Sequence, residues 1–113
     1  MIEQVKDPGR LTHILQAIEY IETFTNGLSF DSLTEDPLYL HAVAHNIQII
    51  GEAVCKLSPE FKAAHPETQW HIIEKMRHVL VHDYYQIDNE VLWDVIQNDL
   101  PKLKEQVNGY LTQ

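Results

Sequence analysis

A short run around position 80 holds three side chains that could together act on a phosphate. Arg77 stands five residues before His82, and Tyr84 follows two residues after that histidine. Histidine titrates near neutral pH and can move a proton, and arginine stays charged and can hold a phosphate. This pair could cleave a phosphodiester without a metal if the 2′-hydroxyl of RNA were the nucleophile. Tyr84 could stack on a base, bind the phosphate or be modified.

A helix must position this run, because the apolar residues before it recur at helical spacing. The pattern predicts a helix that begins near Glu67 or Thr68 and reaches the motif. Its core-facing arc comprises Ile72, Ile73, Met76, Val79 and Leu80. The opposite face carries His78 and Val81, and on an ideal helix Arg77 and His82 lie about 140° apart. They could meet on one phosphate across a two-fold dimer axis, or if the helix ended near His82 and the backbone turned. Dimerisation is the simpler route.

The remaining chain predicts further helices. One begins at Asp7-Pro8, with Asp7 as N-cap, and stops at Asn26-Gly27. A longer one runs from Asp36-Pro37 to about Leu57. Gly51 lies inside it and predicts a close helix crossing, which would offset its poor helix propensity.

The second half continues the helical pattern. A short helix is expected over Phe61–Ala64, and Asp88 is expected to cap a later helix. Leu100-Pro101 predicts a kink or restart there. The prediction is an all-α bundle of four to five helices in one domain, residues 1–113.

Composition limits the functions available to such a domain. The 113 residues carry a formal charge of −9, which argues against a broad nucleic-acid surface. Any nucleic-acid contact should therefore be small and local, or the acidic surface should serve a protein partner. A lone cysteine, Cys55, fits a reducing compartment. Neither a secretory signal nor a membrane-spanning stretch is visible, so we expect a soluble cytoplasmic protein that does not bind a membrane.

The spacing of the histidines also allows an alternative interpretation, a metal-binding site. His41 and His45 form one pair spaced by four residues, and His78 and His82 form another. Each pair can present two nitrogens on one helix face, and two such helices could bind zinc or another transition metal.

Three blocks of sequence resemble the HEPN superfamily of helical nucleotide-associated and ribonuclease domains, and within it the HepT toxin family. They are residues 44–53 (AHNIQIIGEA), residues 57–61 (LSPEF) followed by 65–66 (HP), and residues 76–84 (MRHVLVHDY) continued by 87–88 and 91–101. Together they cover about the C-terminal two-thirds of the chain. The Arg-x₄-His-x-Tyr signature is weak alone and fairly specific in this setting.

The resemblance implies a homodimeric, metal-independent endoribonuclease that needs no cofactor and acts as the toxin of a bacterial toxin–antitoxin pair. It implies that Arg77 and His82 are catalytic. It also implies that an MntA-like nucleotidyltransferase antitoxin silences the toxin by transferring AMP to Tyr84. Two positions depart from the family pattern. His78 replaces a residue that is usually Asn or similar, and it could assist catalysis or only lie at the dimer interface. His45 stands where a basic residue is frequent. The alternative is a HEPN module that binds a nucleotide or partner without cleaving RNA.

Overall fold

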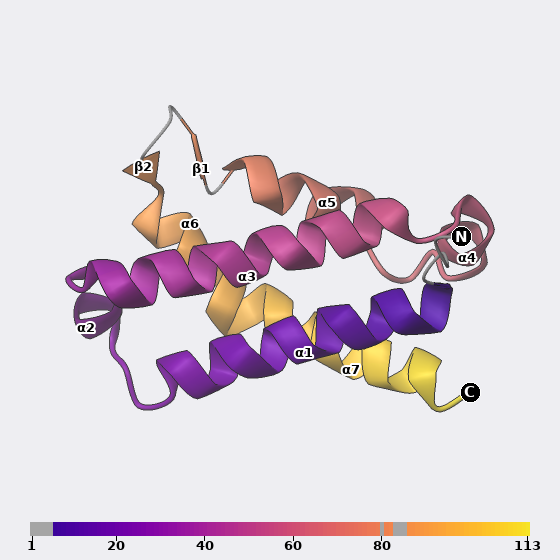
Figure 1. The fold of residues 1–113 in the computed structure, drawn as a ribbon, viewed down its shortest axis with the longest axis horizontal. Coiled ribbons are helices and arrows are strands. Elements are labelled where there is room, and N and C mark those ends of the chain that lie inside the picture. Colours follow the sequence, from indigo (N-terminus) through magenta and orange to yellow (C-terminus); the bar gives the residue numbers. More distant parts are fainter. Residues whose placement is uncertain (1–5, 80, 83–85) are drawn as a thin grey trace, which may run out of the picture.

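The protein is an all-α bundle, as the sequence predicts. A computed structural model describes residues 6–79, 81–82 and 86–113, and the side chains of residues 6–77 and 88–113. Its long helices are α1 (Asp7–Thr25), α3 (Pro37–Lys56), α5 (Trp70–Val79) and α7 (Leu100–Leu111). Figure 1 shows α3 running alongside α1 on one side and α5 on the other. None of the described helices is long and apolar enough to cross a membrane.

Short elements join the long helices. They are α2 (Phe30–Thr34), α4 (Pro59–Ala64), β1 (Val81–His82), β2 (Gln86–Ile87), α6 (Asn89–Asp94) and the π-helical turn η1 (Val95–Asp99). The predicted kink at Leu100-Pro101 lies where η1 passes into α7. The π turn, the separate helix α2 and the two strands are additions to the four to five predicted helices.

Local capping explains several of the helix starts. The Asp36 carboxylate accepts a hydrogen bond from the Leu38 backbone N–H at 2.9 Å, and Asp88 does the same for Val91 at 3.1 Å. The prediction that Asp7 caps α1 is wrong, because Lys6 occupies the cap position and Asp7 begins the helix. The Asp7 carboxylate instead accepts hydrogen bonds from Ser58, at the start of α4.

The core lies between α1, α3, α5 and the C-terminal helices. Ile14, Ile18 and Ile21 of α1 are fully buried, as are Ile47 and Ile50 of α3. Trp70, Ile73 and Met76 contribute the buried face of α5. The helical pattern predicts that Ile72 joins them, but this side chain is 53% exposed. Ile72 is exposed because the apolar stripe of α5 is wider than the surface that the neighbouring helices cover.

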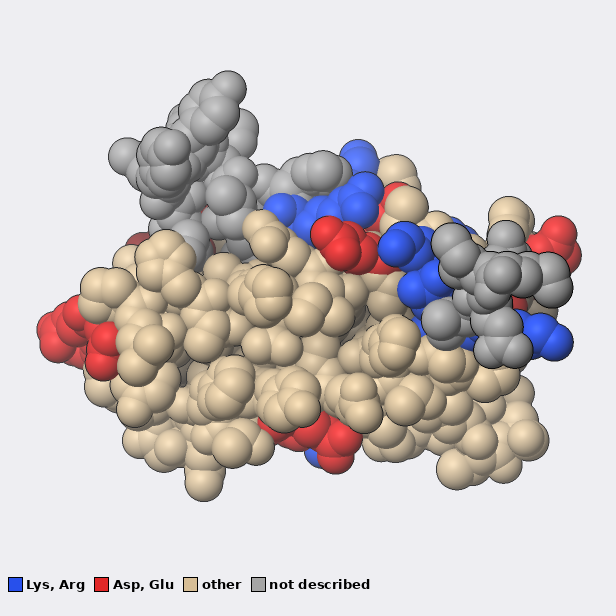
Figure 2. Space-filling view, viewed as in Figure 1, with Lys and Arg blue, Asp and Glu red and all other residues tan. Residues whose placement is uncertain are grey.

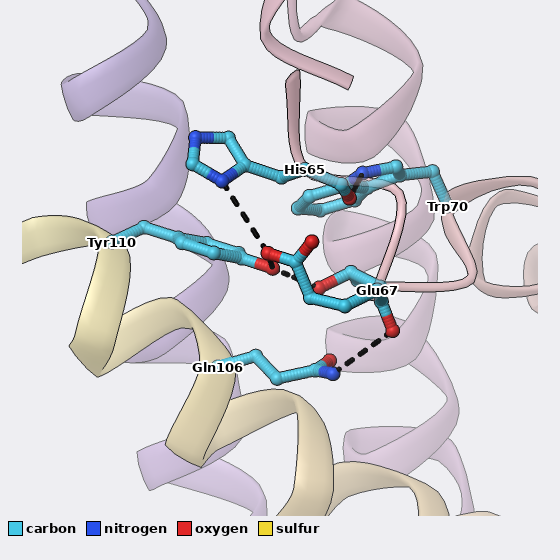
Figure 3. A network of polar contacts seen from close by, with 6 residues as sticks. His65, Glu67, Trp70, Gln106 and Tyr110 are labelled. Atoms are coloured by element: carbon cyan, nitrogen blue, oxygen red, sulfur yellow. Dashed lines mark hydrogen bonds and ion pairs between the residues drawn. The ribbon is translucent and has the colours of Figure 1, made fainter. Parts of the chain in front are cut away.

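A polar and aromatic network ties α7 to the connection between α4 and α5 (Figure 3). The Tyr110 hydroxyl donates to a Glu67 carboxylate oxygen at 2.9 Å and also pairs with the buried Thr68 hydroxyl. His65 Nδ1 lies 3.4 Å from the same Glu67 oxygen, and the His65 ring packs on Tyr110 at 4.3 Å between centroids. These contacts hold the start of α5 against the end of the chain.

Candidate functional site

The predicted site begins where α5 ends. The helix stops at Val79, so the placement of His82 on the same ideal helix as Arg77 is wrong. His82 instead lies in β1, whose backbone pairs antiparallel with β2, with His82 opposite Gln86 and Val81 opposite Ile87. The wheel angle between Arg77 and His82 therefore does not apply. An end of the helix before His82 is part of one of the two routes by which the sequence allows the two side chains to meet, and whether they meet stays a prediction.

Arg77 is the catalytic candidate whose side chain the structure describes. It projects from the last turns of α5 and is 27% exposed. Its Nη2 lies 3.9 Å from the Glu74 carboxylate, one turn earlier on the helix. Its aliphatic stem lies against α3 at Gly51, where a β-carbon added to the glycine would be 3.0 Å from Arg77 Cβ. This contact confirms the close crossing predicted at Gly51. The stem of the arginine thus packs on α3, while about a quarter of the side chain remains exposed.

The remaining motif residues are less fully described. His78 belongs to α5, but its side chain, like that of His82, is outside the described part of the structure. Tyr84 lies outside the described residues altogether. The roles that the resemblance gives to His78, His82 and Tyr84 therefore stay predictions.

A groove of about 440 Å³ runs beside α5, on the side that faces α6 and η1. Its lining is Ile72, Lys75, Met76, Glu90, Val91, Asp94, Val95 and Asp99. Partial burial raises the pKa of the Asp99 carboxyl, and the nearby Asp94 carboxylate raises it further, while Lys102 lowers it. Asp94, the last residue of α6, and Asp99, the last residue of the π turn, both line the groove. The sequence did not predict this groove, because no residue pattern announces a π turn.

The histidine pair of α3 does not form a metal site with its described surroundings. His41 and His45 are both exposed on α3. Among the residues whose side chains are described, no group of three or more His, Cys, Asp or Glu is placed to hold a metal ion. The second predicted pair, His78 and His82, lies outside those side chains.

Charge is distributed in small groups on the face that carries α3 and α5. Figure 2 shows Lys and Arg side chains next to Asp and Glu side chains along the α5 edge, and much of this face is uncharged. An RNA backbone needs clustered cations for a broad contact. This face therefore suits the small, local contact that the net charge of −9 predicts.

The helical bundle and its Arg-x₄-His-x-Tyr run define a HEPN-type domain. Residues 14–109 match the family of HepT-like ribonucleases, described as "Ribonuclease HepT-like", and the chain belongs to this family. It is 36% identical over 101 residues to a "Putative RNase" of Caldanaerobacter subterraneus subsp. tengcongensis, covering 89% of this chain and 90% of that protein. It is 39% identical over 94 residues to a "Probable ribonuclease HepT" of Thermococcus cleftensis, covering 83% of this chain and 86% of that one. No solved structure matches the chain. Relatives named as ribonucleases support RNase activity at the level of the family.

Proposed function

We propose that the protein is a metal-independent endoribonuclease that acts as the toxin of a toxin–antitoxin pair. The observation that carries this proposal is the placement of Arg77 near the end of α5, where its stem packs on α3 at Gly51 and 27% of its side chain stays exposed, five residues before His82 in β1. The family match supports the same reading, because relatives of this chain are named as ribonucleases.

The chemistry needs only groups that the motif supplies. His82 takes the proton of an RNA 2′-hydroxyl, the freed oxygen attacks the adjacent phosphorus, and the bond to the 5′ oxygen breaks. A protonated histidine returns a proton to that leaving oxygen. Arg77 holds the phosphate and stabilises the negative charge that builds on its oxygens. The products are a 2′,3′-cyclic phosphate and a 5′-hydroxyl, and His78 is available as an auxiliary group.

The active form in this proposal is a homodimer with a composite site. Ile72 is a large apolar side chain, 53% exposed, beside the groove along α5. Met76, Val91 and Val95 line the same groove, and apolar side chains gathered in this way at a surface suit a protein contact. A two-fold contact through α5 would bring two copies of the motif together, so that Arg77 of one copy and His82 of the other could act on one phosphate.

Regulation in this proposal comes from a nucleotidyltransferase antitoxin similar to MntA. It would transfer AMP from ATP to the Tyr84 oxygen, with loss of pyrophosphate. The added phosphate carries negative charge two residues after His82. It would compete with the RNA phosphate for Arg77 and so silence the enzyme.

The decisive experiment compares Arg77→Ala and His82→Ala with the wild-type protein in RNA cleavage and in growth arrest. Both variants should lose at least about 100-fold in cleavage rate and should not arrest growth, because each removes a group that acts in the transition state. Lys56→Ala and His71→Ala are matched controls, since both residues are exposed and lie outside the motif. Full cleavage and toxicity in both motif variants would overturn the catalytic roles of Arg77 and His82. A wild-type protein that binds RNA, a nucleotide or a partner but cleaves no RNA would instead favour a HEPN module that binds without cleaving.

Mixing the two inactive variants tests the composite site. If Arg77 and His82 act across the two-fold axis, a mixed dimer keeps one intact site, and random mixing should restore about a quarter of the activity. If both groups of a site come from one chain, mixing restores nothing. Ile72→Glu should yield a monomer by sedimentation velocity and should be inactive. A dimeric Ile72→Glu protein would show that the contact lies elsewhere.

A further inference from the structure

Gly51 occupies a position in α3 where a helix would ordinarily favour another residue. Glycine in a helix interior costs about 1 kcal/mol relative to alanine. Gly51 is buried, and a β-carbon built on it would lie 3.0 Å from Arg77 Cβ, 3.2 Å from Cδ and 3.3 Å from Cγ. These three closest approaches all involve one side chain, the stem of Arg77. The glycine therefore makes room for that arginine.

Arg77 Cβ, the nearest of the three atoms, determines how the structure would respond to a methyl group at position 51. Arg77 Cβ is fixed to the backbone, so it cannot swing aside by a change of rotamer. Normal carbon–carbon contact begins at about 3.5 Å, so α5 would have to move away from α3 by a few tenths of an ångström. The more distant Cγ and Cδ would also be pushed, which would redirect the stem. Both responses displace the guanidinium, because it lies at the end of that stem.

We propose that Gly51 is a positioning residue for Arg77: by lacking a side chain, it lets the arginine stem lie on α3 and fixes where the guanidinium meets a phosphate. This inference rests on the catalytic role proposed for Arg77. Gly51 does not touch the substrate in this account. It sets the depth at which α5 packs on α3, which is one of the larger helix contacts of the bundle.

The substitution Gly51→Ala tests the proposal. It should reduce kcat about tenfold, since misplacement of a catalytic group by about 1 Å can cost 100-fold and this shift is smaller. Two controls separate position from stability. Gly109→Ala adds the same methyl to α7 with nothing within 4 Å, and should leave kcat unchanged. Val54→Ala removes buried volume from α3 and should lower Tm without a comparable loss of kcat. The proposal is overturned if Gly51→Ala matches Gly109→Ala in kcat, or if Val54→Ala at an equal loss of Tm loses as much activity.

A binding measurement shows whether Gly51 acts through Arg77. The probe is a fluorescent RNA that the wild-type protein cleaves, made uncleavable by a 2′-deoxy residue at the cleavage site. Gly51→Ala should weaken its binding several-fold in the wild-type background and leave it unchanged in an Arg77→Gly background, which lacks all three opposing carbons. Equal weakening in both backgrounds would overturn the proposal.

The outcomes also separate this inference from the proposed function. If the wild-type protein cleaves no RNA, or if Arg77→Ala is fully active, the proposed function fails. If Arg77→Ala is inactive and Gly51→Ala behaves like the wild type, only the role of Gly51 fails. Should Gly51→Ala not fold, Gly51→Ala/Arg77→Gly removes the three opposing carbons and should be at least as stable as Arg77→Gly alone, because alanine favours a helix over glycine. Failure of the double variant to fold would mean that another group opposes the methyl, which would overturn the proposal.

Discussion

The carboxylate of Asp7 accepts two hydrogen bonds from Ser58, which lies 51 residues later in the chain. The Ser58 backbone N–H donates at 2.9 Å and its hydroxyl at 2.6 Å. The same hydroxyl accepts a hydrogen bond from the Phe61 backbone N–H at 3.1 Å and so caps α4. One aspartate therefore joins the start of α1 to the junction between α3 and α4, near the N-terminal end of the chain in Figure 1.

Replacing Asp7 by alanine should lower the free energy of unfolding by about 2 kcal/mol, because two hydrogen bonds to a charged acceptor are lost. Urea denaturation measures the change. Ser58→Ala removes part of the same arrangement, so the double variant should cost less than the sum of the two single ones. Glu105→Ala, an exposed acidic residue on α7, is the control and should have little effect. An Asp7→Ala protein as stable as the control would contradict this account.

This contact also shows where sequence reasoning stops. Asp-Pro and Asn-Gly pairs mark the ends of α1 and the start of α3 well, since capping and turn chemistry depend on neighbouring residues. The same rule assigns Asp7 to the cap, but its partner is 51 residues away, which no local pattern can reveal. Gly51 could be predicted as a crossing point because a buried helical glycine needs a reason. The identity of its neighbour, Arg77, required the structure.

The secondary structure of the motif, residues 77–84, was harder to predict from the sequence than the helix ends were. Val79, Leu80 and Val81 continue an apolar pattern that fits a helix or a strand, and periodicity does not separate these over so few residues. In the structure α5 ends at Val79, and His82 lies in strand β1. The exposure of Ile72 likewise depends on which side of α5 its neighbours leave open, and amphipathic spacing does not report that.

Tyr110→Phe should destabilise the protein by about 1–2 kcal/mol, because a buried hydroxyl left without its partner carries this cost. The substitution keeps the ring contacts with His65 and Trp70, but it removes the hydroxyl that pairs with the buried Thr68 and donates to Glu67. Thermal unfolding measures the loss, and Tyr20→Phe is the control because Tyr20 is 57% exposed on α1. Equal Tm values for the two variants would mean that the network of Figure 3 contributes nothing through its hydroxyl.

Asp99→Asn should stabilise the protein at pH 7 by about half a kcal/mol, a small gain because the side chain is largely exposed. The pKa of Asp99 is raised in the folded state above its ordinary value of 3.8, so the folded protein holds the proton more tightly. Stability is then lost as pH rises through the interval between the ordinary and the raised pKa. The advantage of Asp99→Asn should therefore be absent below pH 3.8 and present above the raised value. Unfolding curves across pH test this, with Asp31→Asn on α2 as the control. An advantage that is independent of pH would contradict the assignment.

Removal of metal should leave RNA cleavage unchanged, since the proposed reaction uses a histidine and an arginine. EDTA-treated protein should keep its rate, and His41→Ala/His45→Ala should cleave RNA as the wild type does. The metal reading makes the opposite prediction, because both histidines would be ligands. A loss of activity with EDTA that zinc restores would favour that reading and remove the two-residue mechanism.

Co-expression with a nucleotidyltransferase antitoxin should add AMP to Tyr84 and to no other tyrosine. Peptide mass spectrometry locates the adduct, and the adjacent Tyr85 provides an internal comparison, since both lie in one peptide of the motif. Tyr84→Phe should keep its RNase activity, because the tyrosine takes no proton in the proposed reaction. The antitoxin should no longer protect cells from it. If AMP were found on Tyr85 with Tyr84 unmodified, the switch would lie one residue further along. If Tyr84→Phe were inactive as well as unmodified, the tyrosine would belong to the catalytic machinery, because loss of its hydroxyl would then slow the reaction itself.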